Sequence, residues 1–131
     1  HVIPAMIKKF HIAKIKNKKN VVLWGSGEPK REFLHVDDLA NAVLFILNKN
    51  IDDPFLNVGS GIDLKIKDLA HMIKDIVNFR GKIVWDKSKP DGTPRKLLDI
   101  SKLTKLGWKQ NIKLKDGLIE TYNWFKKSNI N

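Results

Sequence analysis

The sequence predicts an α/β fold in which short strands alternate with amphipathic helices. Three stretches support this prediction. Asn20 to Trp24 is apolar and rich in β-branched residues, which is typical of a buried strand. Apolar residues then recur at helical spacing from Val36 to Leu47 and again from Ile66 to Val77. Because 42% of the 131 residues are hydrophobic, the chain can form one modest core and is not expected to be disordered.

The first half of the chain is predicted to be helix, strand, strand, helix. A helix from Val2 to about Lys16 ends in a lysine cluster, where positive charge suits the helix dipole. A strand follows from Val21 to Trp24, and a short apolar strand is expected from Glu32 to Leu34. The next helix runs from Val36 to Asn48 and opens on Asp37 and Asp38, which suit its N-terminal end.

The second half alternates in the same way. A loop at Asp52 to Pro54 precedes a strand from Phe55 to Val58, and a helix with a continuous apolar face runs from Ile66 to Asn78. A strand from Ile83 to Trp85 leads into a proline- and glycine-containing loop. A short helix near Ser101 to Leu106 and a last helix from Leu114 complete the chain.

The turn Gly25-Ser26-Gly27-Glu28-Pro29 places an aromatic residue and an arginine at its two ends. Glycine and proline favour a tight turn after the strand that ends at Trp24. An aromatic face beside the planar guanidinium of Arg31 would suit a nucleoside diphosphate. The alternative is a tryptophan in the core and an unrelated arginine on the surface.

Composition excludes some kinds of site. The chain has no cysteine, so it has neither disulfides nor thiolate metal sites, which fits a cytoplasmic protein. Its four histidines lack ligand spacing, and we expect no metal. No apolar run is long enough to span a membrane.

The net charge of +11 comes mostly from lysines scattered along the chain. No aromatic residue interrupts the dense cluster Lys14 to Lys19, so this cluster offers no surface on which bases could stack. We therefore expect no nucleic-acid partner.

Four stretches together resemble the GDP-L-fucose synthases, which are extended short-chain dehydrogenase/reductases. The stretches are His1-Val-Ile-Pro-Ala, Trp24-Gly-Ser-Gly, Arg31-Glu-Phe-Leu-His-Val-Asp-Asp-Leu and Ser88-Lys-Pro-Asp-Gly-Thr-Pro-Arg-Lys-Leu-Leu-Asp99. The last is the most specific, because the third alone would indicate only an extended reductase or epimerase that acts on a nucleotide sugar. The resemblance covers essentially the whole chain.

The resemblance implies an NADPH-dependent enzyme that epimerises and reduces GDP-4-keto-6-deoxymannose in the cytoplasm, as a homodimer at full length. Neither the glycine-rich dinucleotide fingerprint nor a Ser and Tyr-x-x-x-Lys catalytic set is found here. We therefore expect residues 1–131 to be a single partial domain, the C-terminal, substrate-binding portion, with the Rossmann half that binds most of the NADP(H) outside it. The chain alone should be inactive. Tyr122 and Lys126 have the Tyr-x-x-x-Lys spacing but lie on an amphipathic helix, so we interpret Tyr122 as a packing residue.

The resemblance also assigns roles to two residues near the start of the chain. His1 matches a histidine that donates a proton to the sugar ring and lies near the nicotinamide, a role suited to imidazole. The alternative is a disordered terminal residue. Lys9 matches a basic substrate contact that is arginine in relatives, on a stripe with Val2 and Met6 that faces the sugar nucleotide. The alternative is a solvated pair with Lys8.

Four further residues are expected to bind the substrate. Trp24 should cover the nucleotide or sugar, and Arg31 should bind the diphosphate. Asp91 should accept hydrogen bonds from ribose or guanine, and Lys96 should neutralise phosphate. The alternative for Asp91 is a tight turn in which the carboxylate accepts from its own backbone. His35, Asp37 and Asp38 are interpreted as helix-start residues.

Two other interpretations remain open. A UDP- or dTDP-sugar epimerase or dehydratase of the same superfamily is the nearer one, and a basic nucleic-acid-binding domain is the more distant. The family pattern also has Ser or Thr at two helix N-caps where this chain has Lys65 and Lys113, which should cost about 1 kcal/mol each.

Overall fold

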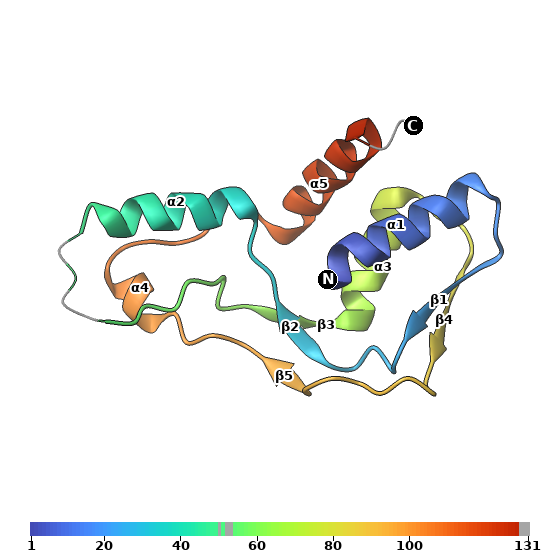
Figure 1. The fold of residues 1–131 in the computed structure, drawn as a ribbon, viewed down its shortest axis with the longest axis horizontal. Helices are drawn as coiled ribbons and strands as arrows, with labels where there is room; N and C mark the ends of the chain where they lie inside the picture. The colour runs from blue at the N-terminus through green and yellow to red at the C-terminus, as the bar shows by residue number, and fades with distance from the viewer. Residues whose placement is uncertain (50, 52–53, 129–131) are drawn as a thin grey trace.

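Two groups of helices lie at opposite ends of the fold, with one small sheet between them and a second sheet along the outer side of one group (Figure 1). The computed structural model describes residues 1–49, 51 and 54–128. In chain order its elements are α1 (Val2–Ile15), β1 (Asn20–Trp24), β2 (Lys30–Glu32), α2 (Val36–Leu47), β3 (Asp63–Lys65), α3 (Ile66–Val77), β4 (Lys82–Asp86), β5 (Arg95–Lys96), α4 (Ser101–Lys105) and α5 (Leu114–Ser128). The prediction of a mixed α/β fold is confirmed.

The larger core lies between α1, α3 and a two-stranded parallel sheet of β1 and β4. Successive side chains of a strand point to opposite faces, and in β1 this places Val21 and Leu23 in the core. Phe10 of α1 and Leu69 of α3 are fully buried opposite them. The other face of this sheet, with Val22 and Trp24, stays exposed.

A smaller core joins α2 to α4 at the other end of the molecule. Its buried members are Ala42, Leu103 and Trp108. The buried carboxylate of Asp38 accepts hydrogen bonds from the backbone amides of Asn111 and Ile112, at 3.0 and 2.9 Å, and so ties α2 to the segment before α5. His35 is the N-cap of α2, and its Nδ1 accepts from the amide of Asp37 at 3.3 Å, as the interpretation of these residues as helix-start structure predicts.

A three-stranded sheet in the order β3-β2-β5 connects the two ends (Figure 1). β2 pairs antiparallel with β3 and parallel with β5. The sequence predicted the strand two residues later, at Glu32 to Leu34, because Phe33 and Leu34 are apolar; their side chains instead pack against the two cores. β3 and β5 were not predicted, because strands of two or three mostly polar residues carry no apolar alternation.

The strand predicted from Phe55 to Val58 is wrong. Leu56 and Val58 do pack against the smaller core, as alternate residues of a strand would. No neighbouring strand pairs with this segment among the residues that the structure describes, and its backbone is irregular. Asp52 and Asp53 of the predicted preceding loop lie outside the described residues.

The start of α3 shows how the chain compensates for a missing cap. Lys65 occupies the N-cap position and its side chain makes no capping bond, as predicted. The amides of Ile66 and Lys67 instead donate to the carbonyls of Pro29 and Gly27, each at 2.9 Å. The turn after β1 is thereby bound to the first turn of α3.

One face of α2 is apolar and exposed. Val36, Leu39, Val43, Leu44 and Leu47 line it, and Leu47 keeps 75% of its surface accessible. Solvent-exposed apolar patches of this kind commonly mark surfaces that another polypeptide covers. No helix among the described residues is long and apolar enough to cross a membrane.

Candidate functional site

Trp24 lies on the uncovered face of the β1–β4 sheet and remains 68% exposed. It ends β1, and alternation along the strand turns its side chain away from the core. The ammonium groups of Lys9 and Lys89 each lie 5.8 Å from the centre of its ring. The alternative of a core tryptophan is therefore excluded, and the ring is available for stacking.

Arg31 and Trp24 line one cleft of about 310 Å³. Val2, Phe33 and Asp91 also border it. The Nη1 group of Arg31 donates to the carbonyl of Lys30 at 2.7 Å, which uses one of the five N–H donors of the guanidinium. A cleft with an aromatic face and a guanidinium on its walls can accept a flat ring and an oxygen anion together.

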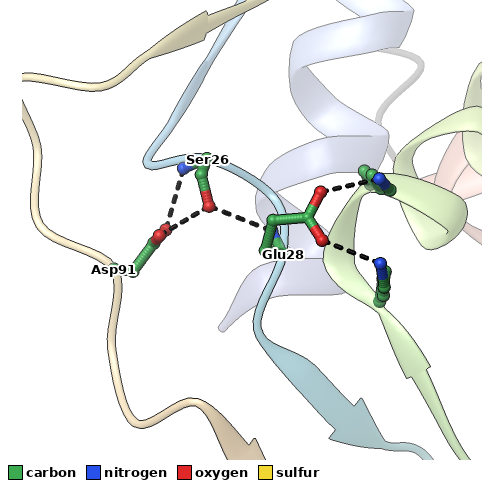
Figure 2. Close-up of polar contacts among 5 residues, drawn as sticks. Ser26, Glu28 and Asp91 are labelled. Carbon is green, nitrogen blue, oxygen red and sulfur yellow. Dashed lines mark hydrogen bonds and ion pairs between the residues drawn. The ribbon is translucent and has the colours of Figure 1, made fainter.

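Asp91 connects the two loops that form the cleft. Its carboxylate accepts from the backbone amide of Ser26 at 2.8 Å and from the Ser26 hydroxyl at 2.5 Å (Figure 2). These two bonds to Ser26 hold the pKa of Asp91 below its usual value. The contact is close, because a Cβ on Gly25 would overlap the Asp91 carboxylate. The Asp91 carboxylate thus binds the opposite loop, 65 residues away in sequence. The alternative had expected it to bind the backbone of its own turn.

Lys9 lies next to this site. Its Nζ donates to the carbonyl of Val22 at 3.0 Å and lies over Trp24. The stripe predicted for α1 holds only in part, because Val2 lines the cleft whereas Met6 is buried in the core. Lys9 therefore lies beside Trp24, and both Lys9 and Lys8 are exposed at the surface.

Lys96 and His1 are near the cleft without lining it. Lys96 is the register partner of Arg31 across β2 and β5, so the two side chains share one face of the sheet. His1 is exposed at the N-cap of α1 and its side chain makes no capping bond. It directly precedes Val2, which does line the cleft.

Tyr122 is a packing residue, as interpreted from the sequence. It is buried, and its hydroxyl forms a 3.1 Å hydrogen bond with Nδ1 of His11. Its ring stacks with Phe125, and burial raises the pKa of its hydroxyl. The ammonium of Lys126 lies 5.0 Å from the ring centre, far from any role at the cleft.

Sequence reasoning missed three residues that shape the site. The Glu28 carboxylate accepts hydrogen bonds from the ammonium groups of Lys65 and Lys67, at 2.8 and 2.6 Å. These two ion pairs lower the pKa of the Glu28 carboxylate to about 2. Glu32 also lines the cleft and accepts from the amides of Gly61 and Leu98. Lys89 contacts Trp24. All three contact residues that are far away in sequence. Only Lys89 lies within a motif that the sequence analysis had singled out, the Lys-Pro-Asp-Gly run.

A basic cavity of about 460 Å³ lies elsewhere, where α1 and α3 end. Lys14, Lys18 and Arg80 line it, and the Lys14 ammonium donates to the carbonyl of Val77 at 2.9 Å. Lysines at helix C-termini complement the helix dipole, which accounts for this cluster. None of the predicted site residues lies here. Among the residues that the structure describes, no group of three or more His, Asp or Glu could hold a metal ion.

The chain is similar to one protein family and to several individual proteins. Residues 1–59 match the NAD dependent epimerase/dehydratase family. The chain is 55% identical over 130 residues to a probable GDP-L-fucose synthase 1 of Oryza sativa subsp. japonica, covering 99% of this chain and 40% of the relative. It is 48% identical over 134 residues to the GDP-L-fucose synthase of Escherichia coli, covering 95% of this chain and 42% of the relative.

Among solved structures, the chain is similar to a GDP-L-fucose synthetase from Naegleria fowleri bound to NADP. The TM-score is 0.88 at 31% identity, covering 98% of this chain and 40% of that one. The chain thus spans about two fifths of the length of the curated relatives it matches.

Proposed function

We propose that this chain, a homologue of the GDP-L-fucose synthases, binds the GDP part of a nucleotide sugar in the cleft between Trp24 and Arg31. The observation that carries the proposal is the convergence of Trp24, Arg31 and Asp91 on that cleft. All three were selected from sequence, and they come from two segments about 65 residues apart.

The chemistry of the walls suits a nucleoside diphosphate. The exposed Trp24 ring stacks on the base or the sugar, and the remaining donors of Arg31 bind diphosphate oxygens. Lys9 beside Trp24 and Lys96 beside Arg31 add positive charge. Asp91 keeps one wall in place through Ser26, and lone pairs of its carboxylate that Ser26 does not use accept from ribose or base.

The complete reaction is proposed to be the 3,5-epimerisation and 4-reduction of GDP-4-keto-6-deoxymannose, with this chain as the substrate-binding part of the enzyme. His1 is the proposed proton donor to the sugar ring, because imidazole exchanges protons near neutral pH. It directly precedes Val2, which lines the cleft.

The Gly59-Ser60-Gly61 turn does not fit the pyrophosphate of NADP. In the Gly59-Ser60-Gly61 turn the amide of Gly61 already donates to Glu32 at 2.6 Å, and a Cβ on Gly59 would overlap the Glu32 carboxylate. The cofactor is proposed to be held mainly by residues outside this chain, with His1 as a contact within it.

Calorimetric titration of the chain with GDP, UDP and dTDP tests the proposal. We expect GDP to bind most tightly. Arg31→Ala should weaken that binding roughly 10- to 100-fold, because a charge-assisted contact of about 1.5–3 kcal/mol is lost. Arg31→Lys should recover only part of it. Arg80→Ala, which removes an arginine outside the cleft, is the matched control.

Other outcomes would favour other functions. Equal or tighter binding of UDP or dTDP would indicate a UDP- or dTDP-sugar enzyme. Binding of DNA or RNA with steep salt dependence, and no preference for GDP, would indicate a nucleic-acid-binding domain.

A further inference from the structure

The turn that joins Trp24 to Arg31 is held in place by a chain of charged and polar contacts (Figure 2). Asp91 accepts from the amide and hydroxyl of Ser26. The Ser26 hydroxyl oxygen in turn accepts from the amide of Glu28 at 3.1 Å, and the Glu28 carboxylate binds Lys65 and Lys67. We call these five residues the carboxylate relay.

The carboxylate relay crosses three segments of the fold. Asp91 belongs to the loop between β4 and β5, Ser26 and Glu28 to the turn after β1, and the two lysines to the start of α3. Because Trp24 and Arg31 flank the turn that carries Ser26 and Glu28, anchoring that turn at both sides sets the positions of both side chains.

Two glycines let the backbone of the turn approach its neighbours closely. Gly25 and Gly27 have φ angles of +79° and +77°, a region that residues with a side chain rarely adopt. A Cβ on Gly27 would lie 2.7 Å from the ring of Trp85 and 3.0 Å from Cβ of Lys67. The turn is thus seated directly on β4 and α3.

The relay also adds negative charge to the start of α3, where Asp68 is the acidic residue of the first turn. Lys65 and Lys67 bring two positive charges to the end of α3 where the helix dipole is positive. Glu28 lies against both ammonium groups, and its pKa of about 2 keeps it ionised throughout the neutral and mildly acidic range.

We propose that Ser26 and Glu28 are positioning residues of the nucleotide-sugar site, which hold Trp24 and Arg31 at the spacing that the ligand requires. This inference rests on the proposed function for its ligand. The residues of the relay are exposed or half-buried, and ion pairs that solvent reaches add little to global stability. The relay should therefore affect the geometry of the cleft far more than the melting temperature of the chain.

Nuclear magnetic resonance of the chain tests the positioning directly. In Ser26→Ala, the indole N–H signal of Trp24 and the Nε–H signal of Arg31 should shift, with the Trp24 signal identified by Trp24→Phe. Ser26→Thr keeps the hydroxyl and should restore both signals. Ser88→Ala is the matched control, because the Ser88 hydroxyl makes a similarly short bond of 2.6 Å to Asp86 within its own turn.

Binding of GDP gives the second readout. Ser26→Ala and Glu28→Gln should each weaken GDP binding roughly tenfold, whereas Ser26→Thr and Ser88→Ala should bind like the unchanged chain. Unshifted Trp24 and Arg31 signals in Ser26→Ala would overturn the positioning role. So would unchanged affinity of Ser26→Ala and Glu28→Gln when Arg31→Ala weakens binding.

The two proposals fail in distinguishable ways. If the unchanged chain does not bind GDP, the proposed function is wrong, and the Trp24 and Arg31 signals still decide whether the relay positions these side chains. If GDP binds and the signals do not respond to Ser26→Ala, the function stands and the relay is only part of the surface.

Discussion

Replacing Trp24 with alanine should weaken GDP binding with almost no effect on folding. The ring is 68% exposed and belongs to neither core, so its removal leaves no cavity. A base stacked on an aromatic side chain contributes about 1–3 kcal/mol. Trp24→Ala therefore tests the contribution of the ring to GDP binding with almost no change in the free energy of unfolding.

Two contacts of the Trp24 ring reduce the loss of GDP-binding free energy expected for Trp24→Ala. The ammonium groups of Lys9 and Lys89 lie near the Trp24 ring, and an exposed cation–π contact contributes about 0.5–1 kcal/mol. A stacking ligand displaces one of these contacts. The net loss on Trp24→Ala should then be about 1–2 kcal/mol, a roughly 5- to 30-fold rise in the Kd for GDP.

Trp124→Ala is the matched control. Trp124 lies on α5 and is 66% exposed, so the substitution removes the same side chain at nearly the same accessibility, outside the cleft. Calorimetry with GDP and urea unfolding should be measured on both variants. An unchanged Kd for Trp24→Ala, or an equal loss for Trp124→Ala, would refute the stacking role.

Four further predictions follow from the same structure. The folded-state pKa of Glu28 is about 2, below its ordinary value of 4.5, so its contribution to stability, which is small because the ion pairs are solvent-exposed, is present above pH 4.5 and lost as the pH falls towards 2; Glu28→Gln should remove this small loss, and a Glu28 carboxylate that titrates near 4.5 by NMR would contradict the ion pairs. Gly27→Ala should destabilise the chain by about 1–2 kcal/mol or more in urea, because of its positive φ and its contact with Trp85. Leu44→Lys with Leu47→Lys on the exposed face of α2 should reduce hydrophobic-dye binding and self-association of the chain, and a monomer that binds no dye before the change would contradict an uncovered face. In a complete enzyme that contains this chain, His1→Asn should slow proton exchange into the sugar ring by roughly 10²–10⁴, and normal exchange by NMR in deuterated water would exclude a proton-donor role.

The helices were predictable because their apolar periodicity is strong. The apolar positions of Ile66 to Val77 give α3 its buried face, and the start of α2 at Val36 agrees with the prediction. The failures were in short or unpaired segments. β5 has two residues and no apolar pattern, and Phe55 to Val58 has the pattern but no partner strand among the described residues.

The site was predictable to the extent that it lies within one segment. The glycine turn between Trp24 and Arg31 indicated that the two side chains belong to one loop, and both line the cleft. The partner of Asp91 was not predictable, because Ser26 is 65 residues away and meets it only through the pairing of β1 with β4. Glu28 was missed for the same reason, since its two lysines belong to β3 and α3.

Mapping GDP onto the chain by chemical-shift perturbation tests the central claim most directly. Titration of the labelled chain should move the signals of Trp24, Arg31 and Gly92, which border the cleft. In Arg31→Ala the same changes should need roughly 10- to 100-fold more GDP. Perturbations confined to Lys14, Lys18 and Arg80 in the basic cavity, or no perturbation at saturating GDP, would contradict a nucleotide site in the cleft.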